Sequence, residues 1–141
     1  MLIRVEIPID APGIDALLRR SFESDAEAKL VHDLREDGFL TLGLVATDDE
    51  GQVIGYVAFS PVDVQGEDLQ WVGMAPLAVD EKYRHKGIGH AFFDHVKTIK
   101  QQKNFDSIEL QVNARNEDAM KMYADYGFTP KSINMELTNY D

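Results

Sequence analysis

The residues best suited to chemistry lie in one short segment, in which the apolar run Leu77-Ala78-Val79 leads into a basic loop. Arg84 and Lys86 carry positive charge directly before Gly87 and Gly89, and helical periodicity starts at these glycines. The first turn of a helix has N–H groups without helical acceptors and the positive end of the helix dipole, and glycine lets a ligand approach the backbone closely. A strand, a glycine loop and a helix in this order predict a site for a small anion.

The charge distribution favours the same segment. The net charge is −11, with sixteen acids and five bases in residues 1–80, whereas residues 81–103 hold six Lys or Arg against two acids. Non-specific binding to nucleic acid needs a broad basic face, so this acidic chain is not expected to bind nucleic acid. A small polyanion on the basic segment fits the pattern. A solvated helix face rich in lysine is the alternative that charge alone leaves open.

Two familiar phosphate-binding loops do not match. A P-loop requires Lys and then Ser or Thr after its last glycine, and His90 and Ala91 follow Gly89 here. A dinucleotide-binding fingerprint requires a third glycine three residues after the second, and Phe92 stands there. The pair of glycines is therefore a weak indication when taken alone.

Local patterns predict the elements that position this segment. Apolar residues recur at three- and four-residue steps in the helical stretches, and β-forming residues gather in the strands. Gly38 is expected to end a helix, the DDEG sequence at 48–51 to turn a hairpin, and Pro76 to produce a bulge or a separation of neighbouring strands. The expected strands are 2–7, 40–47, 52–59, 69–79, 106–112 and 132–137, and the expected helices lie within 12–37, 87–103 and 116–126.

Composition limits the class of protein. The 141 residues suffice for one hydrophobic core, and no repeat or linker divides them, so we expect a single domain over residues 1–141. No apolar run approaches the roughly 20 residues that span a bilayer, and the N-terminus lacks the apolar region of a signal peptide, so a cytoplasmic protein without a membrane partner is expected. Cysteine is absent, and His85, His90 and His95 share no helix face, so no metal site is expected.

A longer pattern makes the loop specific. Arg84-His85-Lys86-Gly87-Ile88-Gly89, directly after Leu77-Ala78-Val79, resembles the acyl-CoA-binding motif R/Q-x-x-G-x-G/A of the GNAT N-acetyltransferase superfamily. The segment NEDAMKMYADYGF, residues 116–128, is similar to the second family motif, N-x-x-A-x-x-x-Y-x-x-x-G-F, at every specified position. FSPV at 59–62 and GMAPLAV at 73–79 are further similar to a bacterial branch of the family, from which the segment before the final Gly-Phe differs.

The resemblance implies an α/β fold of the α+β type. Its mixed, mostly antiparallel central sheet would have six to seven strands flanked by about four helices, with the central strands splayed at the cofactor site. The element order along the chain agrees, since it indicates a largely antiparallel sheet with a parallel step near its middle. The resemblance also implies acetyl-CoA as the acyl donor and a primary amine as the acceptor, and it is compatible with a homodimer.

The resemblance assigns roles to individual residues. The backbone N–H groups of the loop would surround the CoA pyrophosphate, and the side chains of Arg84 and Lys86 would add charge. The edge of the preceding strand would bind the pantetheine arm, and the N–H of Leu77 would polarise the thioester carbonyl. The expected cofactor-binding residues are Leu77, Ala78, Val79, Arg84, His85, Lys86, Gly87, Ile88, Gly89, Asn116 and Tyr123.

Two residues of the second motif have competing interpretations. Asn116 is placed to cap the last helix, and in the family the matching side chain contacts the cofactor arm; both roles stay open. Tyr123 lies on the inward helix face, as a core residue would, and in the family the matching tyrosine protonates the departing CoA thiolate. We expect Tyr123 to be the catalytic acid, since the spacing of Tyr126 to the final Gly-Phe does not fit the motif.

The chemistry also requires a neutral amine, so a base or a water chain must remove its proton. Asp63, Glu67 and Asp68 are candidates, although an exposed acid is the favoured interpretation of each. The absence of cysteine favours direct transfer in a ternary complex over a cysteinyl acyl-enzyme. The acids of residues 1–80 hint at a cationic acceptor such as a polyamine, an aminoglycoside or a lysine side chain. A non-catalytic CoA-binding or regulatory module with the same fold is the alternative.

Overall fold

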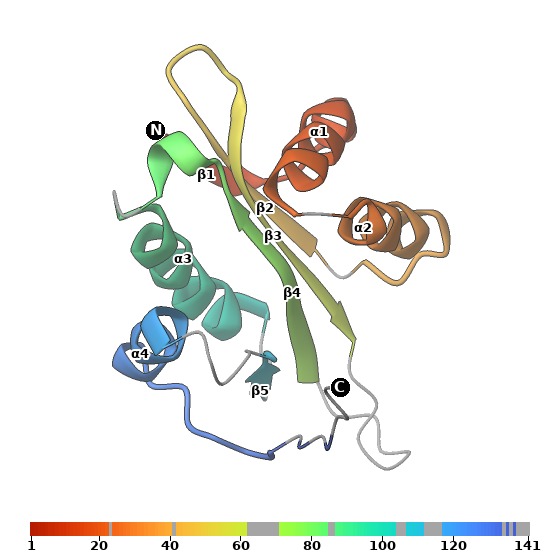
Figure 1. Ribbon diagram of the computed structural model, residues 1–141. Coiled ribbons are helices and arrows are strands. Elements are labelled where there is room, and N and C mark those ends of the chain that lie inside the picture. The colour runs from red at the N-terminus through yellow and green to blue at the C-terminus, as the bar shows by residue number, and fades with distance from the viewer. Residues whose placement is uncertain are drawn as a thin grey trace. The chain divides into compact units, whose positions relative to one another are not determined.

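The computed structural model describes residues 1–22, 24–40, 42–61, 71–84, 87–103, 107–111, 117–133, 135 and 137. These residues belong to two compact units, Met1–Gln111 and Val112–Asp141, and each unit is described by itself. The described part of the first unit carries the sheet with helices α1, α2 and α3 (Figure 1). The second unit carries α4, Glu117–Asp125.

Five strands form the sheet in the described part of the chain. They lie in the order β1-β2-β3-β4-β5, with antiparallel pairing from β1 to β4 and parallel pairing between β4 and β5. The predicted α/β class, with a mostly antiparallel sheet and one parallel step, is therefore confirmed. The strands are β1 Leu2–Val5, β2 Leu42–Thr47, β3 Val53–Pro61, β4 Trp71–Val79 and β5 Ser107–Glu109.

The expected number of six to seven strands is wrong for the described residues, which form four antiparallel strands and one short parallel strand. Residues 132, 133, 135 and 137 of the expected last strand lie outside any strand. Ile133, Met135 and Leu137 alternate along the chain as strand residues do, yet their side chains are exposed. Alternation alone does not make a strand, because strand pairing needs a neighbouring backbone.

Helices cover both faces of the sheet. α1, Ala11–Ser21, and α2, Ala26–Glu36, lie on one face, and α3, Ile88–Lys103, lies on the other (Figure 1). Every residue of β2 is buried, as are the first seven residues of β3. Burial on both faces explains why these two strands read as continuous apolar runs.

The buried cluster between the sheet and helices α1 and α2 holds one tyrosine among aliphatic side chains. A β-bulge in β3, where Ala46 pairs with Gly55 and Thr47 with Val53, shifts the alternation of side chains so that Val53 joins the same cluster as Tyr56. This packing fixes α1 and α2 against the strands that lead to the glycine loop. The buried cluster is Ile14, Leu17, Leu18, Ala28, Val31, Val45, Val53, Tyr56, Ala58 and Ala78.

The turns follow the local signals of the sequence. Gly38 after α2 has a φ of 76°, and Gly51 in the hairpin has a φ of 81°; glycine adopts such conformations without steric cost. The Asp48 carboxylate accepts hydrogen bonds from the N–H groups of Glu50 and Gln52, both at 2.9 Å. The predicted end of α2 and the predicted hairpin are therefore confirmed.

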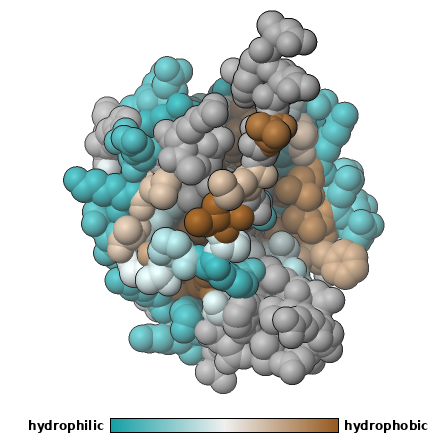
Figure 2. All heavy atoms as spheres, turned by 60° about the horizontal axis from the view of Figure 1, so that its bottom comes forward, coloured by the Kyte–Doolittle hydropathy of each residue, from teal (hydrophilic) through white to brown (hydrophobic). Residues whose placement is uncertain are grey.

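Some large apolar side chains stay on the surface. Leu2 and Val5 of the edge strand β1, and Ile7 just after it, are each more than half exposed. Figure 2 shows one face of the molecule, on which apolar residues lie among hydrophilic ones. None of the described helices combines the length and the apolar character that a bilayer crossing requires.

A partly buried ion pair joins the start of α1 to the first strand. The Arg4 guanidinium donates two hydrogen bonds to the Asp10 carboxylate, at 2.7 and 2.9 Å, and the Ile7 N–H donates a third at 2.8 Å. Asp10 is only 7% exposed. The hydrogen bonds from Arg4 are the main reason why the pKa of Asp10 lies below its ordinary value, and burial acts in the opposite direction.

We expect Asp10→Asn to lower the free energy of unfolding by about 2 kcal/mol at pH 7, because the hydrogen-bonded carboxylate is lost. A lowered pKa means that the pair stabilises the fold above the ordinary aspartate pKa of 3.8, and that this effect is lost as the pH falls through the folded-state pKa. Urea unfolding at about pH 7 and about pH 2 measures both effects. The surface variant Asp15→Asn is the control, and an equal Asp10→Asn deficit at both pH values would contradict the prediction.

Candidate functional site

The predicted cofactor site begins where the regular ladder of β4 is interrupted. Between two successive paired positions, β4 has two residues, Ala75 and Pro76, where β3 has only Ala58. This is a β-bulge with the extra residue on β4. Proline has no N–H to give to the ladder, and the bulge that Pro76 predicts is confirmed.

Beyond this bulge, β4 has a described strand on one side only. Its parallel pairing with β5 joins Trp71–Gly73 to Ser107–Glu109 and goes no further. From Leu77 to Val79, β4 pairs with β3 and with no other strand in the described ranges. An extended ligand can add to such an edge in the way that a further strand would.

A single 3₁₀ turn connects β4 to the glycine loop. The turn spans Glu81–Tyr83, and Asp80 caps it by accepting a hydrogen bond from the Lys82 N–H at 3.1 Å. The chain leaves the turn at Arg84, whose side chain is exposed and whose Nε donates to the Val79 carbonyl at 3.0 Å. A guanidinium has five N–H donors, so this bond leaves others for an anion.

The glycine turn and the start of α3 have the predicted conformation. Gly87 has a φ of 84°, which a residue with a Cβ adopts only at a cost. The Ala91 N–H donates to the Gly87 carbonyl at 3.0 Å, so the N–H groups of Ile88 and Gly89 precede this helical hydrogen bond and lack an acceptor within the helix. The Ile88 side chain is buried and anchors this end of the helix.

Helix α3 lies close to the sheet because Gly55 leaves room for it. A Cβ at Gly55 would lie 2.9 Å from Cε2 and 3.1 Å from Cζ of the Phe92 ring. Phe92 is buried and comes one turn after the start of α3. The missing side chain at Gly55 therefore sets the distance between the sheet and the helix that carries the glycine loop.

Tyr123, the predicted catalytic acid, lies in the last turn of α4 in the second unit. Gly127 follows the helix with a φ of 100°, and the Phe128 N–H donates to the Tyr123 carbonyl at 3.1 Å. The rings of Tyr123 and Phe128 pack edge to face, with centroids 5.9 Å apart. Burial raises the pKa of Tyr123 above its ordinary value of 10.0, so the phenol keeps its proton at neutral pH.

The structure describes some of the predicted site residues and not others. The structure brings the strand edge, Arg84 and the glycines together in the first unit, whereas the catalytic role of Tyr123 stays a prediction. The predicted residues outside the described ranges are the loop residues His85 and Lys86, the cap Asn116, and the base candidates Asp63, Glu67 and Asp68.

The sequence patterns do not reveal a polar network that joins β1, α2 and β3. The buried Tyr56 hydroxyl donates to the Glu6 carboxylate at 2.6 Å, and Arg35 donates to its other oxygen at 2.7 Å. Burial, followed by the hydrogen bond to Glu6, raises the pKa of Tyr56, so the phenol remains a donor. A Cβ at Gly43 would collide with the Glu6 carboxylate. Glu6 is 29 and 50 residues away from its two partners, and no local pattern marks contacts of that span.

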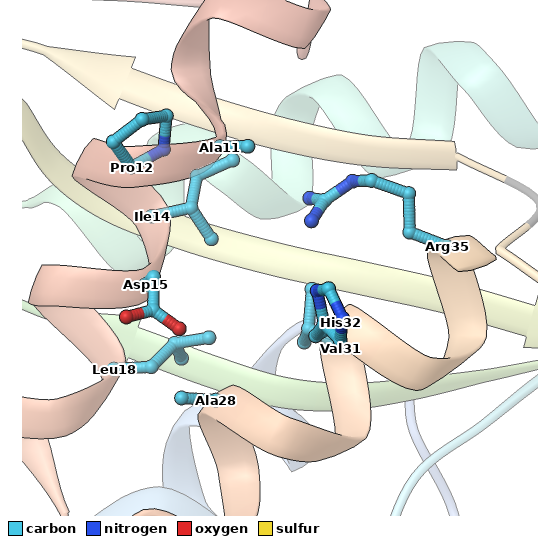
Figure 3. Close-up of a pocket in the computed structure, with 9 residues that line it drawn as sticks. All are labelled: Ala11, Pro12, Ile14, Asp15, Leu18, Ala28, Val31, His32 and Arg35. Carbon is cyan, nitrogen blue, oxygen red and sulfur yellow. The ribbon is translucent and has the colours of Figure 1, made fainter.

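A hollow of about 270 Å³ lies between α1 and α2 and is lined by apolar and polar side chains of both helices (Figure 3). Two of its polar groups already have partners, because Asp15 pairs with Arg19 and Arg35 pairs with Glu6. None of the predicted site residues lines it. Its lining residues are Ala11, Pro12, Ile14, Asp15, Leu18, Ala28, Val31, His32 and Arg35.

The strand edge, the glycine turn and the helix start agree with a family comparison. The model of the acetyltransferase (GNAT) family matches residues 11–128. The chain therefore belongs to the acetyltransferase (GNAT) family. The predicted family is confirmed, and the match runs across the boundary between the two compact units.

Relatives and solved structures support the same family and fold. Over 88 residues, 62% of its length, the chain is 97% identical to the uncharacterized N-acetyltransferase YhbS of Escherichia coli strain K12, and it covers 53% of that protein. The chain thus spans about half the length of the curated relatives it matches. A structure of E. coli YhbS in complex with CoA has a TM-score of 0.81 and 67% identity, covering 91% of this chain and 68% of that one. A Brucella melitensis GNAT acetyltransferase in complex with acetyl-CoA has a TM-score of 0.77 and 28% identity, covering 99% of this chain and 92% of that one.

The identity to E. coli YhbS is unevenly distributed along the chain. The 88-residue match at 97% contains about 85 identical positions, and the structural match at 67% over 91% of 141 residues contains about 86. The structural match covers about 128 residues, which is roughly 40 more than the 88-residue match. These further residues therefore add almost no identical position. Any stretch of 88 residues within 141 includes residues 54–88, so the nearly identical segment contains all of β4, the turn and Gly87.

We expect Gly55→Ala to lower the free energy of unfolding by about 1–3 kcal/mol, because the new methyl group overlaps the Phe92 ring. The same overlap should displace the start of α3 and weaken the binding of acetyl-CoA. Urea unfolding and calorimetric titration measure the two effects. Adding Phe92→Leu, which removes the overlapping ring atoms, should recover part of both losses. A Gly55→Ala variant as stable as the wild type would contradict the prediction.

Proposed function

We propose that this chain is an acyl-CoA-dependent N-acyltransferase, which moves an acetyl group from acetyl-CoA to a primary amine by direct transfer in a ternary complex. The observation that carries the proposal is the one-sided edge of β4 at Leu77–Val79, followed by the turn to Gly87 and the start of α3. Membership of the GNAT family supports it, as do the related structures with CoA and acetyl-CoA.

In this proposal the backbone supplies most of the cofactor contacts. The amide groups of the pantetheine arm pair with the strand edge at Leu77–Val79. The Leu77 N–H donates to the thioester carbonyl and stabilises the negative charge that develops on its oxygen. The N–H groups from Arg84 to Gly89 hold the pyrophosphate at the start of the helix, with charge added by the Arg84 and Lys86 side chains.

The proposed transfer forms one bond and breaks one. The amine nitrogen attacks the thioester carbonyl carbon, the new C–N bond forms, and the C–S bond breaks to release the CoA thiolate. The nitrogen loses one proton to a base, and the thiolate gains one from Tyr123. Burial keeps this phenol protonated. Desolvation also raises the proton affinity of the thiolate, which favours transfer of the phenol proton to it.

We propose a cationic amine as the acceptor, because residues 1–80 hold sixteen acids against five bases and in the family the corresponding part of the fold supplies the acceptor side. The candidate bases, Asp63, Glu67 and Asp68, all lie between residues 54 and 88, within the segment shared almost unchanged with E. coli YhbS. We therefore propose that the two proteins act on the same acceptor.

The family match from residue 11 to residue 128 supports one acetyltransferase domain that includes both compact units. The single domain over residues 1–141, the cytoplasmic location and the homodimer remain predictions from the sequence.

The test of this function starts with calorimetric titration of the full chain with acetyl-CoA. Thiol release is then measured with polyamines, aminoglycosides and lysine peptides, and with neutral amines as controls. We expect binding of acetyl-CoA and turnover of at least one cationic amine. Binding without turnover across the panel would favour the non-catalytic CoA-binding module, and the absence of binding would refute the cofactor site.

We expect Tyr123→Phe to lower kcat by about a hundredfold or more, the usual effect of losing a general acid, with the Kd of acetyl-CoA little changed. Thiol release at saturating substrates and calorimetry give the two quantities. Tyr126→Phe is the matched control, because the hydroxyl lost lies three residues further along the chain. Equal turnover in Tyr123→Phe and the wild type would assign Tyr123 to packing.

We expect Arg84→Ala combined with Lys86→Ala to raise the Kd of acetyl-CoA by about tenfold or more, because two charged contacts to the pyrophosphate are lost. The affinity of the variant should also depend less on salt than that of the wild type. Lys97→Ala combined with Lys100→Ala removes the same charge further along α3 and should leave the Kd unchanged. An equal effect of both double variants would count against the loop assignment.

A further inference from the structure

Two neighbouring arginines in the last turn of α1 have different partners. Arg20 reaches the residue after β4: its Nε and Nη2 lie 3.2 and 2.9 Å from Oδ2 of Asp80. Its Nη2 also lies 3.3 Å from the Val53 carbonyl, at the start of β3. Arg19 instead pairs with Asp15 and Asp25, which lie on α1 and just before α2. Of these two arginines, Arg20 is therefore the one that connects α1 to the segment that leads into the glycine loop.

Asp80 is held from several directions. Its Oδ1 accepts from the Lys82 N–H at 3.1 Å, while Oδ2 binds Arg20. Its own N–H donates to the Ile54 carbonyl at 2.7 Å, and its carbonyl accepts from the Tyr83 N–H at 2.8 Å. The carboxylate therefore ties the 3₁₀ turn to α1, and the backbone of the same residue ties that turn to β3.

The position of Arg84 depends on this turn. The Arg84 N–H lies 3.4 Å from the Glu81 carbonyl, and its Nε donates to the Val79 carbonyl. The chain thus turns from the end of β4 to Arg84 within four residues, Asp80 to Tyr83. A rotation of the Asp80 side chain would change the direction in which the chain enters the loop and the place of its charge.

The electrostatics keep this connection in place at neutral pH. Asp80 is 19% exposed and Arg20 is 47% exposed. Partial burial alone would raise the pKa of Asp80, but the Lys82 N–H and the Arg20 guanidinium together hold it below its ordinary value. Asp80 is therefore ionised, and both of its oxygens are occupied.

We propose that Arg20 is a positioning residue for acyl-CoA, which acts through Asp80 to fix the turn that delivers Arg84 and the glycine loop to the pyrophosphate. The inference rests on the proposed function, because it assigns a role at the same cofactor site. Arg20 does not touch the reacting atoms. Arg20 instead helps to hold the loop in its binding conformation before acyl-CoA binds, and it thereby raises the affinity for acyl-CoA.

The test compares Arg20→Ala with Arg19→Ala, which removes the same charge from the adjacent residue of equal exposure, 47%. We expect Arg20→Ala to raise the Kd of acetyl-CoA by about fivefold, the effect of losing a partly exposed ion pair, and Arg19→Ala to leave it unchanged. At saturating acetyl-CoA, kcat and the KM of the amine should stay within about twofold of the wild type. Arg20→Lys, which keeps the charge, should recover part of the affinity.

A double variant checks that Arg20 acts through Asp80. Asp80→Asn keeps an oxygen that can cap the turn and removes the charge that binds Arg20. If the two residues act together, the double variant of Arg20→Ala and Asp80→Asn should have a Kd for acetyl-CoA no higher than that of the single variant with the lower affinity. Additive losses of affinity would overturn the proposed route.

Further outcomes separate this inference from the function on which it rests. A wild-type chain that binds no acetyl-CoA refutes both. A wild type that binds, with the same Kd in Arg20→Ala, overturns the positioning role alone. Arg20→Ala could instead raise the Kd of acetyl-CoA and the KM of the amine and lower kcat, all by the same factor, together with a lower melting temperature. This result would show that Arg20 merely stabilises the fold, and it would also overturn the positioning role.

Discussion

The arrangement of the site depends on an interruption in the hydrogen-bond ladder of β4. At Ala75 and Pro76 the strand gains a residue against β3, and beyond Gly73 its parallel pairing with β5 stops. Among the described strands, a row of backbone groups is thereby left at an edge, which most sheets cover or shorten because an open edge invites unwanted pairing. Here the edge leads directly into a glycine turn and a helix start, which is the arrangement on which the proposed cofactor site rests.

The layers on both sides hold this edge in a fixed geometry. On one face, Tyr56 and Ala78, which are paired across β3 and β4, belong to the buried cluster under α1 and α2. On the other face, the Phe92 ring of α3 lies against Gly55. The open part of β4 is thus supported by packing on both faces, which is how a rigid scaffold presents a binding edge without a conformational change.

The features that the sequence predicts correctly are those set by local backbone chemistry. Pro76 cannot donate to a ladder wherever it stands, and Gly38 and Gly87 permit positive φ values that other residues avoid, so the bulge, the end of α2 and the glycine turn could all be predicted. The motif that contains Tyr123 indicated the family, which the match over residues 11–128 confirms.

The features that the sequence does not reveal depend on distant partners. Arg20 and Asp80 are 60 residues apart, and nothing in the charge pattern distinguishes Arg20 from Arg19. The described residues of the expected strand 132–137 lie outside any strand for a related reason, since a strand requires a neighbour that local alternation cannot supply. Side-chain networks and sheet edges therefore need the tertiary fold, whereas caps and turns do not.

The Glu6 carboxylate has a consequence for how the molecule opens. It receives the Tyr56 hydroxyl on one oxygen and the Arg35 guanidinium on the other. It thereby joins the residue after β1 to the middle of β3 and the last turn of α2. A helix of eleven residues is not stable in isolation. If α2 detached alone, a mostly buried carboxylate would lose its cation, which is costly. The backbone amides of α2 and β1 should therefore exchange with solvent as one cooperative unit, separate from the more deeply buried β2 and β3.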